Sequence, residues 1–104
     1  MVEIKKLTTQ EFKKNLSALR KSVQNGDLII ELTNYNPVIG FLVAEKHLEA
    51  IPVKKSMTIK LSLFRDLIQD CGKTLAEGCD CIYIKFHKTT IMAFVNTKFR
   101  DYIV

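Results

Sequence analysis

The sequence predicts an α+β fold in which tandem helix–β-hairpin units form an antiparallel sheet with the helices packed on one side. Three observations support this prediction. Apolar residues recur at helical spacing through residues 12–23, two apolar strands joined by a polar turn follow in residues 28–43, and the same order of elements returns in residues 57–104. One helix on a two-stranded hairpin is only marginally stable, whereas two units that share a sheet bury much more apolar surface.

The first helix is expected to begin at a capping box. Thr8 and Glu11 stand three residues apart, so each side chain can bond the backbone N–H of the other residue. Asn25 and Gly26 are residue types that end helices, which places this helix at about residues 9–25. Residues 3–7 suit either a short strand or an extended arm. The apolar stripe of the helix comprises Phe12, Leu16, Leu19 and Val23. The predicted core contains Phe12, Leu16, Leu19 and Ile30, with Phe64, Ile68 and Ile82 as the matching residues of the second half.

A β-hairpin is expected after the first helix. Side chains of residues 28–33 alternate along a strand, and residues 34–37 (NYNP) are rich in turn formers. Residues 38–43 then form the return strand, which is apolar on both faces as in a covered strand. Residues 45–51 indicate a short helix that closes the first unit.

The second half resembles the first without a gap. After the linker-like residues 52–56, a shift of 52 positions produces eight identical pairs, among them Phe12 with Phe64 and Gly26 with Gly78. The chain is therefore predicted to be a single compact domain over residues 1–104, made of two similar halves, 1–52 and 57–104. Any two units of this type would align about as well, so a true duplication stays open. The second half is expected to contain a helix (62–77), two strands (80–86 and 90–96) and a short terminal helix (97–103).

Composition places the chain in the cytoplasm. No apolar run approaches the roughly 18 residues of a membrane-spanning helix, and the N-terminus lacks the apolar stretch of a signal peptide. Three cysteines are an odd number for a disulfide framework and fit a reducing compartment. The net charge of +5 allows a nucleic-acid partner.

Four consecutive segments of the first half carry a resemblance to a known family. The helix "LTTQEFKKNLSALRKSVQNG", the strand "DLIIELT", the return strand "NPVIGFLV" and the short helix "EKHLEAI" resemble the Phd/YefM family of bacterial antitoxins. The resemblance covers residues 1–51. It implies a dimer that binds operator DNA through the N-terminal half, represses its own operon and neutralises a toxin with a C-terminal tail.

The chain also departs from the pattern of that family. Residues 57–104 have strand and helix periodicity where the family has a tail that is disordered until the toxin orders it, which puts the usual mode of toxin binding in doubt. Tyr35 and Asn36 stand in a turn where the family often carries a basic or small residue.

Basic residues near the first helix are the candidate DNA contacts. Phosphate binding needs positive charges on long side chains, and the resemblance favours the N-terminal segment and the first helix. An ordinary solvated face is the alternative interpretation of the same stripe. The candidate residues are Lys5, Lys6, Lys13, Lys14, Arg20 and Lys21.

Other chemistry is weakly indicated. Cys79, Cys81 and His87 lack the second ligand pair of a zinc site, and Cys81 falls on a strand face where a small buried residue is expected. His47 has no acid–base companion at a recognisable spacing. The cluster formed by Lys54, Lys55 and Lys60 is typical of a solubilising connector.

The sequence thus favours a DNA-binding transcriptional regulator, not an enzyme, that resembles a type II antitoxin. It predicts binding to double-stranded operator DNA as a homodimer, with no cofactor, no metal and no membrane contact. A cognate toxin or another protein is a further candidate partner. The alternative is a protein-binding module on the same fold, such as an inhibitor, adaptor or assembly factor, that does not bind DNA.

Overall fold

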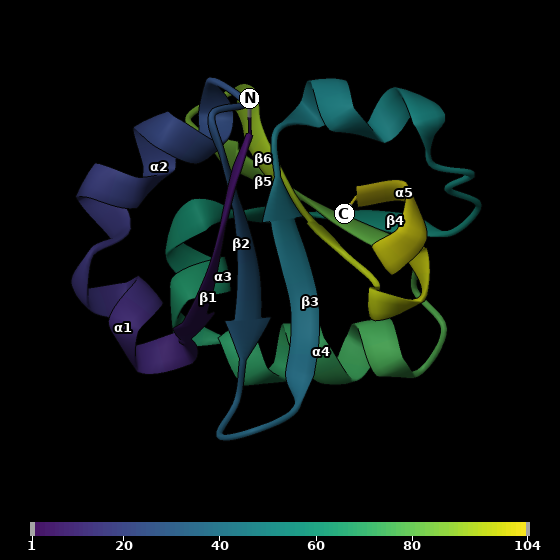
Figure 1. The fold of residues 1–104 in the computed structure, drawn as a ribbon, viewed down its shortest axis with the longest axis horizontal. Helices are drawn as coiled ribbons and strands as arrows, with labels where there is room; N and C mark the ends of the chain where they lie inside the picture. The colour runs from purple at the N-terminus through teal and green to yellow at the C-terminus, as the bar shows by residue number, and fades with distance from the viewer. Residues whose placement is uncertain (1, 104) are drawn as a thin grey trace.

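Six strands form one mixed sheet in the computed structural model, which describes residues 2–103 (Figure 1). Their order across the sheet is β1-β2-β3-β6-β5-β4. The predicted antiparallel sheet is wrong in part, because β1 runs parallel to β2 and β4 runs parallel to β5. In each case a pair of helices separates the two strands, and such a crossover returns the chain in the same direction. The strands are β1 (Glu3–Thr8), β2 (Leu28–Thr33), β3 (Val38–Val43), β4 (Ser56–Lys60), β5 (Cys81–Phe86) and β6 (Thr89–Val95).

Four helices cover one face of this sheet. They are α1 (Thr9–Lys14), α2 (Leu16–Gln24), α3 (Leu61–Asp66) and α4 (Ile68–Ala76). The helices predicted for these regions are present, but each is divided by one residue with non-helical dihedral angles, Asn15 (φ −112°) and Leu67 (φ −114°). The predicted capping box is confirmed, since the Glu11 N–H donates to Thr8 Oγ1 at 3.1 Å and the Thr8 N–H donates to Glu11 Oε1 at 3.0 Å.

Short helical segments cover the opposite face, so the expectation of helices on one side only is also wrong. These segments are η1 (Glu45–Ala50), η2 (Thr97–Phe99) and α5 (Arg100–Ile103). Leu48 and Phe99 pack there against Phe41, Val43 and Val95. The strands are apolar on both faces, and the short segments supply the apolar cover that the second face needs.

The linker predicted at residues 52–56 ends earlier than expected, because Ser56 begins β4. Asp80 holds the remaining connector in place. Its carboxylate accepts hydrogen bonds from the backbone N–H groups of Lys54 (2.8 Å) and Lys55 (3.1 Å) and forms an ion pair with Lys98. The Lys98 contact and these two backbone bonds lower the pKa of Asp80 to about 2.

Element bounds repeat at a spacing of 52 residues. α1 and α3 span residues 9–14 and 61–66, and α2 and α4 span 16–24 and 68–76. The hairpin turns repeat as well, since Tyr35 and His87 both adopt positive φ angles, 63° and 58°. Below, the residue 52 positions away in the other half is called the counterpart.

The two halves meet along β3 and β6 about an approximate twofold axis. Leu42 pairs with its own counterpart, Phe94, in the antiparallel register. Phe12 and its counterpart Phe64 meet edge to face with ring centroids 6.0 Å apart, and Phe64 meets Phe94 at 5.2 Å. Gly40 leaves room for this cluster, because a Cβ atom there would lie 2.4 Å from the Phe94 ring.

Most of the predicted core is confirmed. Phe12, Ile30, Phe64, Ile68 and Ile82 are buried in the cluster between the helices and the sheet. Two further predicted core residues, Leu16 and Leu19, are partly buried and pack against this cluster. The break at Asn15 divides the helix between Phe12 and these two leucines.

Candidate nucleic-acid interface

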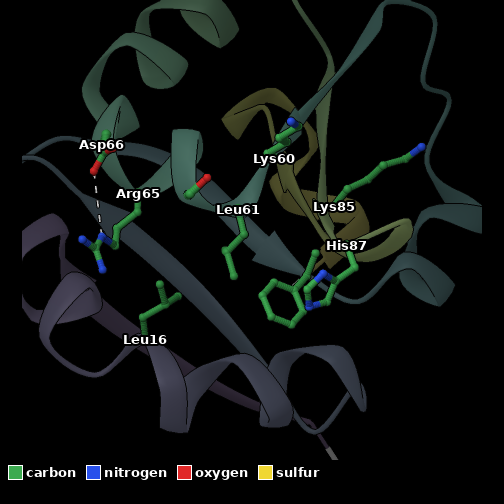
Figure 2. A pocket seen from close by; sticks show the side chains of 9 residues that line it. Leu16, Lys60, Leu61, Arg65, Asp66, Lys85 and His87 are labelled. Atoms are coloured by element: carbon green, nitrogen blue, oxygen red, sulfur yellow. Dashed lines mark ion pairs between the residues drawn. The ribbon is translucent and has the colours of Figure 1, made fainter.

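A groove in the second half brings together three basic side chains, Lys60, Arg65 and Lys85. It has a volume of about 540 Å³ and lies between α3, the β5–β6 turn and the start of α2 (Figure 2). We call it the basic groove. It is lined by Leu16, Lys60, Leu61, Ser62, Arg65, Asp66, Lys85, Phe86 and His87.

A second, smaller groove of about 210 Å³ lies at the related position of the first half. We call it the polar groove. Thr8, Lys13 and Tyr35 line it and are the counterparts of Lys60, Arg65 and His87. Each groove is completed by a residue of the other half, Leu16 in the basic groove and Gln69 in the polar groove. The polar groove is lined by Thr8, Thr9, Gln10, Lys13, Asn34, Tyr35 and Gln69.

The two halves differ in charge at one pair of neighbouring strand residues close to the grooves. Lys60 and Lys85 are register partners at the ends of β4 and β5, with backbones about 4.8 Å apart as in any sheet. Both lysine side chains are exposed. Within residues 2–103, neither lysine forms an ion pair with a carboxylate. Their counterparts, Thr8 and Thr33, form an uncharged pair at the same position.

Arg65 adds a third cation on the other side of Leu61 in Figure 2. Its Nε lies 3.9 Å from Asp66 Oδ1, and both side chains are exposed. An exposed contact of this length contributes little binding energy, so the guanidinium stays available to another anion. Asp66 is the one acidic residue among the residues that line the basic groove.

Aromatic side chains form the wall of the groove at the β5–β6 turn. Phe86 is 39% exposed, and the His87 ring lies 4.2 Å from its centroid. The guanidinium carbon of Arg20 lies 4.3 Å above the Phe86 ring, which is a cation–π contact between the two halves. Arg20 Nε is buried without a hydrogen-bond partner in the described residues. Arg20, a predicted DNA contact, therefore packs against Phe86 and is not among the residues that line the basic groove.

The other predicted DNA contacts are dispersed. Lys5 and Lys6 are exposed on the edge strand β1, where alternation directs them to opposite faces of the sheet. Lys13 and Lys14 are exposed in the last turn of α1, and Lys21 is exposed on α2. Of the six predicted residues, only Lys13 lines one of the two grooves.

Arg65 and Lys85 are not among the candidate contacts predicted from the sequence, and Lys60 was assigned to a connector. Lys60 and Lys85 are 25 positions apart in the chain and become neighbours only through the parallel register of β4 and β5. The alignment of the two halves at a shift of 52 positions could have identified these lysines, because it sets each of them against an uncharged residue, Thr8 or Thr33.

The cysteines are free thiols. Burial raises the pKa of the Cys81 thiol to about 12, so this side chain stays protonated and is a poor metal ligand. Cys81 is buried in the same apolar cluster as Ile29, its counterpart, and the predicted burial of this cysteine is confirmed. Among the residues that the structure describes, no three His, Cys, Asp or Glu side chains form a cluster that could hold a metal ion.

The described helices are all too short or too polar to span a bilayer. Comparison of the chain with family models, curated proteins and solved structures finds no match in any of the three.

Proposed function

We propose that this chain is a DNA-binding transcriptional regulator that resembles a type II antitoxin and binds double-stranded operator DNA. In this proposal, the chain is a tandem of two Phd/YefM-like units that imitates a dimer. The observation that carries the proposal is the twofold arrangement of the halves, with Leu42 paired to its counterpart Phe94. Operators are often pseudo-palindromic because the proteins that bind them have twofold symmetry.

The dimensions of the chain support contact with one turn of duplex. Its principal extents are 30 × 30 × 29 Å, and one turn of B-DNA rises about 34 Å. Counterpart side chains in the two halves can therefore reach phosphates that lie within about one helical turn of each other.

The contacts are assigned first to exposed basic residues of the N-terminal half. Lys13 and Lys14 project from α1, and Lys21 projects from α2. Lys5 and Lys6 offer further charges on the β1 edge. Long cationic side chains on a chain with a net charge of +5 attract phosphates without selecting a base sequence, so they supply affinity and register.

The alternative function, a protein-binding module, is favoured by a different observation. β1 and β4 are the outer strands of the sheet, and each exposes a large apolar side chain, Ile4 (42%) and Met57 (45%). An extended segment of a partner, such as a toxin, could add to such an edge. Homodimerisation stays a prediction, which sedimentation equilibrium of the purified chain would test.

Duplex binding at several salt concentrations distinguishes these functions. Fluorescence anisotropy with DNA from the upstream promoter should show strong, salt-dependent binding by the wild type. Replacing Lys13 and Lys14 with Glu should weaken binding and reduce the slope of log K against log salt by about 1.8, the value for two lost phosphate contacts. Lys54→Glu/Lys55→Glu is the control with the same change in net charge, and circular dichroism verifies the fold. Absence of wild-type binding at physiological salt would make the protein-binding module the better proposal.

A further inference from the structure

We propose that the basic groove is a phosphate-binding site. Its ligand is a phosphate group with an attached organic part, either a phosphodiester of duplex DNA or a free phosphorylated molecule. If the ligand is a DNA phosphate, the inference rests on the proposed function. The second half is then a principal region of DNA contact. The first half, which the sequence favours for DNA contact, has the less basic of the two grooves.

The charge of the groove is the first argument. Lys60, Arg65 and Lys85 carry three positive charges, and Asp66 carries the one negative charge among the lining residues. That carboxylate is engaged only by Arg65, at 3.9 Å and in an exposed position. Both lysines are left without a carboxylate partner in the described residues.

The second argument is the register that makes Lys60 and Lys85 neighbours. Lys60 and Lys85 are exposed register partners on neighbouring strands, so an anion at this position of the sheet can be reached by both ammonium groups. The related position in the first half holds Thr8 and Thr33, so the same backbone arrangement is built without the charges. The lysine pair is therefore not required by the fold, and we assign it to anion binding.

The remaining wall of the groove suits the organic part of a phosphate ester. Leu16, Leu61 and Phe86 offer apolar surface next to the cations. The guanidinium carbon of Arg20 lies 4.3 Å from the centroid of the Phe86 ring, so Arg20 adds a positive charge close to the site. A sugar can pack against such a surface while its phosphate contacts the lysines.

The test compares two double variants with equal net charge. Lys60→Thr/Lys85→Thr converts the lysine pair into the threonine pair of the first half. Threonine suits both a strand and the position before a helix, so the fold should survive. Lys54→Thr/Lys55→Thr removes two charges from the connector and leaves their backbone bonds to Asp80 in place. Each protein is titrated with promoter duplex by anisotropy and with inorganic pyrophosphate by NMR.

For DNA phosphates, the slope of log K against log salt should fall by about 1.8 in Lys60→Thr/Lys85→Thr relative to the control, and affinity should fall at every salt concentration. For a free phosphorylated ligand, pyrophosphate should shift the amide signals of Lys60, Leu61 and Phe86 in wild type and control. Those shifts should disappear in Lys60→Thr/Lys85→Thr. Either result supports the site.

The outcomes separate this inference from the proposed function. If duplex binds equally well to both variants and pyrophosphate shifts the same signals in both or in neither, the groove is not a phosphate site, although DNA binding stands. If the wild type binds pyrophosphate but no duplex, and Lys60→Thr/Lys85→Thr does not bind pyrophosphate, the phosphate site stands and the proposed function fails. If the wild type binds neither probe, both proposals are overturned.

Discussion

Truncation of Phe64 to alanine should strongly destabilise the whole domain, because this ring joins the two halves. Phe64 is fully buried and meets Phe12 and Phe94 edge to face, at centroid distances of 6.0 and 5.2 Å. Removal of a buried Phe costs about 3–5 kcal/mol, and aromatic pairs of this geometry are worth about 0.5–1.5 kcal/mol each beyond their buried area. We expect a loss near the upper end, about 4–5 kcal/mol, out of a total of roughly 5–15 kcal/mol for a domain.

The matched control is Phe86→Ala, which removes the same side chain from a position that is 39% exposed. It loses the Arg20 contact and partial burial, so its cost should be about 1–2 kcal/mol. Urea unfolding followed by circular dichroism measures both free energies. Each kcal/mol should lower Tm by about 4–8 °C in a domain of this size. Equal losses in the two variants, or a Phe64→Ala protein with an unchanged midpoint, would refute the role of this cluster in joining the halves.

Gly40→Ala should cost about 1–3 kcal/mol of stability, because the added Cβ would lie 2.4 Å from the Phe94 ring. In a double-mutant cycle measured by urea unfolding, this cost should be smaller when Phe94 is also replaced by leucine. The pKa of Asp80 is lowered from 3.8 to about 2, so its stabilising contribution is complete above pH 3.8 and is lost as the pH falls toward 2. Asp80→Asn should therefore flatten the fall in the free energy of unfolding between pH 3.8 and pH 2. A pH profile that is the same in wild type and variant would contradict the role of this carboxylate. Thiol titration of the denatured, non-reduced protein should find three free thiols. In the native protein, Cys79 should react well before Cys81, because burial keeps the Cys81 thiol protonated. Equal reaction rates of these two cysteines in the native protein would contradict this arrangement.

The sequence by itself determined the type and position of most elements. The capping box at Thr8, the helical spacing from Phe12 and the turn at residues 34–37 are local signals, and each one acts within a few residues. The strand at residues 38–43 was predicted with its observed bounds. Local propensity did not reveal the breaks at Asn15 and Leu67, where the backbone leaves helical geometry for one residue.

Only the tertiary structure decided how the strands pair and where the charges gather. β4 was hidden in the sequence because a short segment after Lys54 and Lys55 resembles a connector, and it becomes a strand by pairing with β5. That same pairing makes Lys60 and Lys85 neighbours across 25 positions of sequence, while the predicted contacts Lys5 and Lys6 fall on opposite faces of one strand. Strand register is set by burial of apolar faces over the whole sheet, so the position of a charge cluster built across strands cannot be read from spacing along the chain.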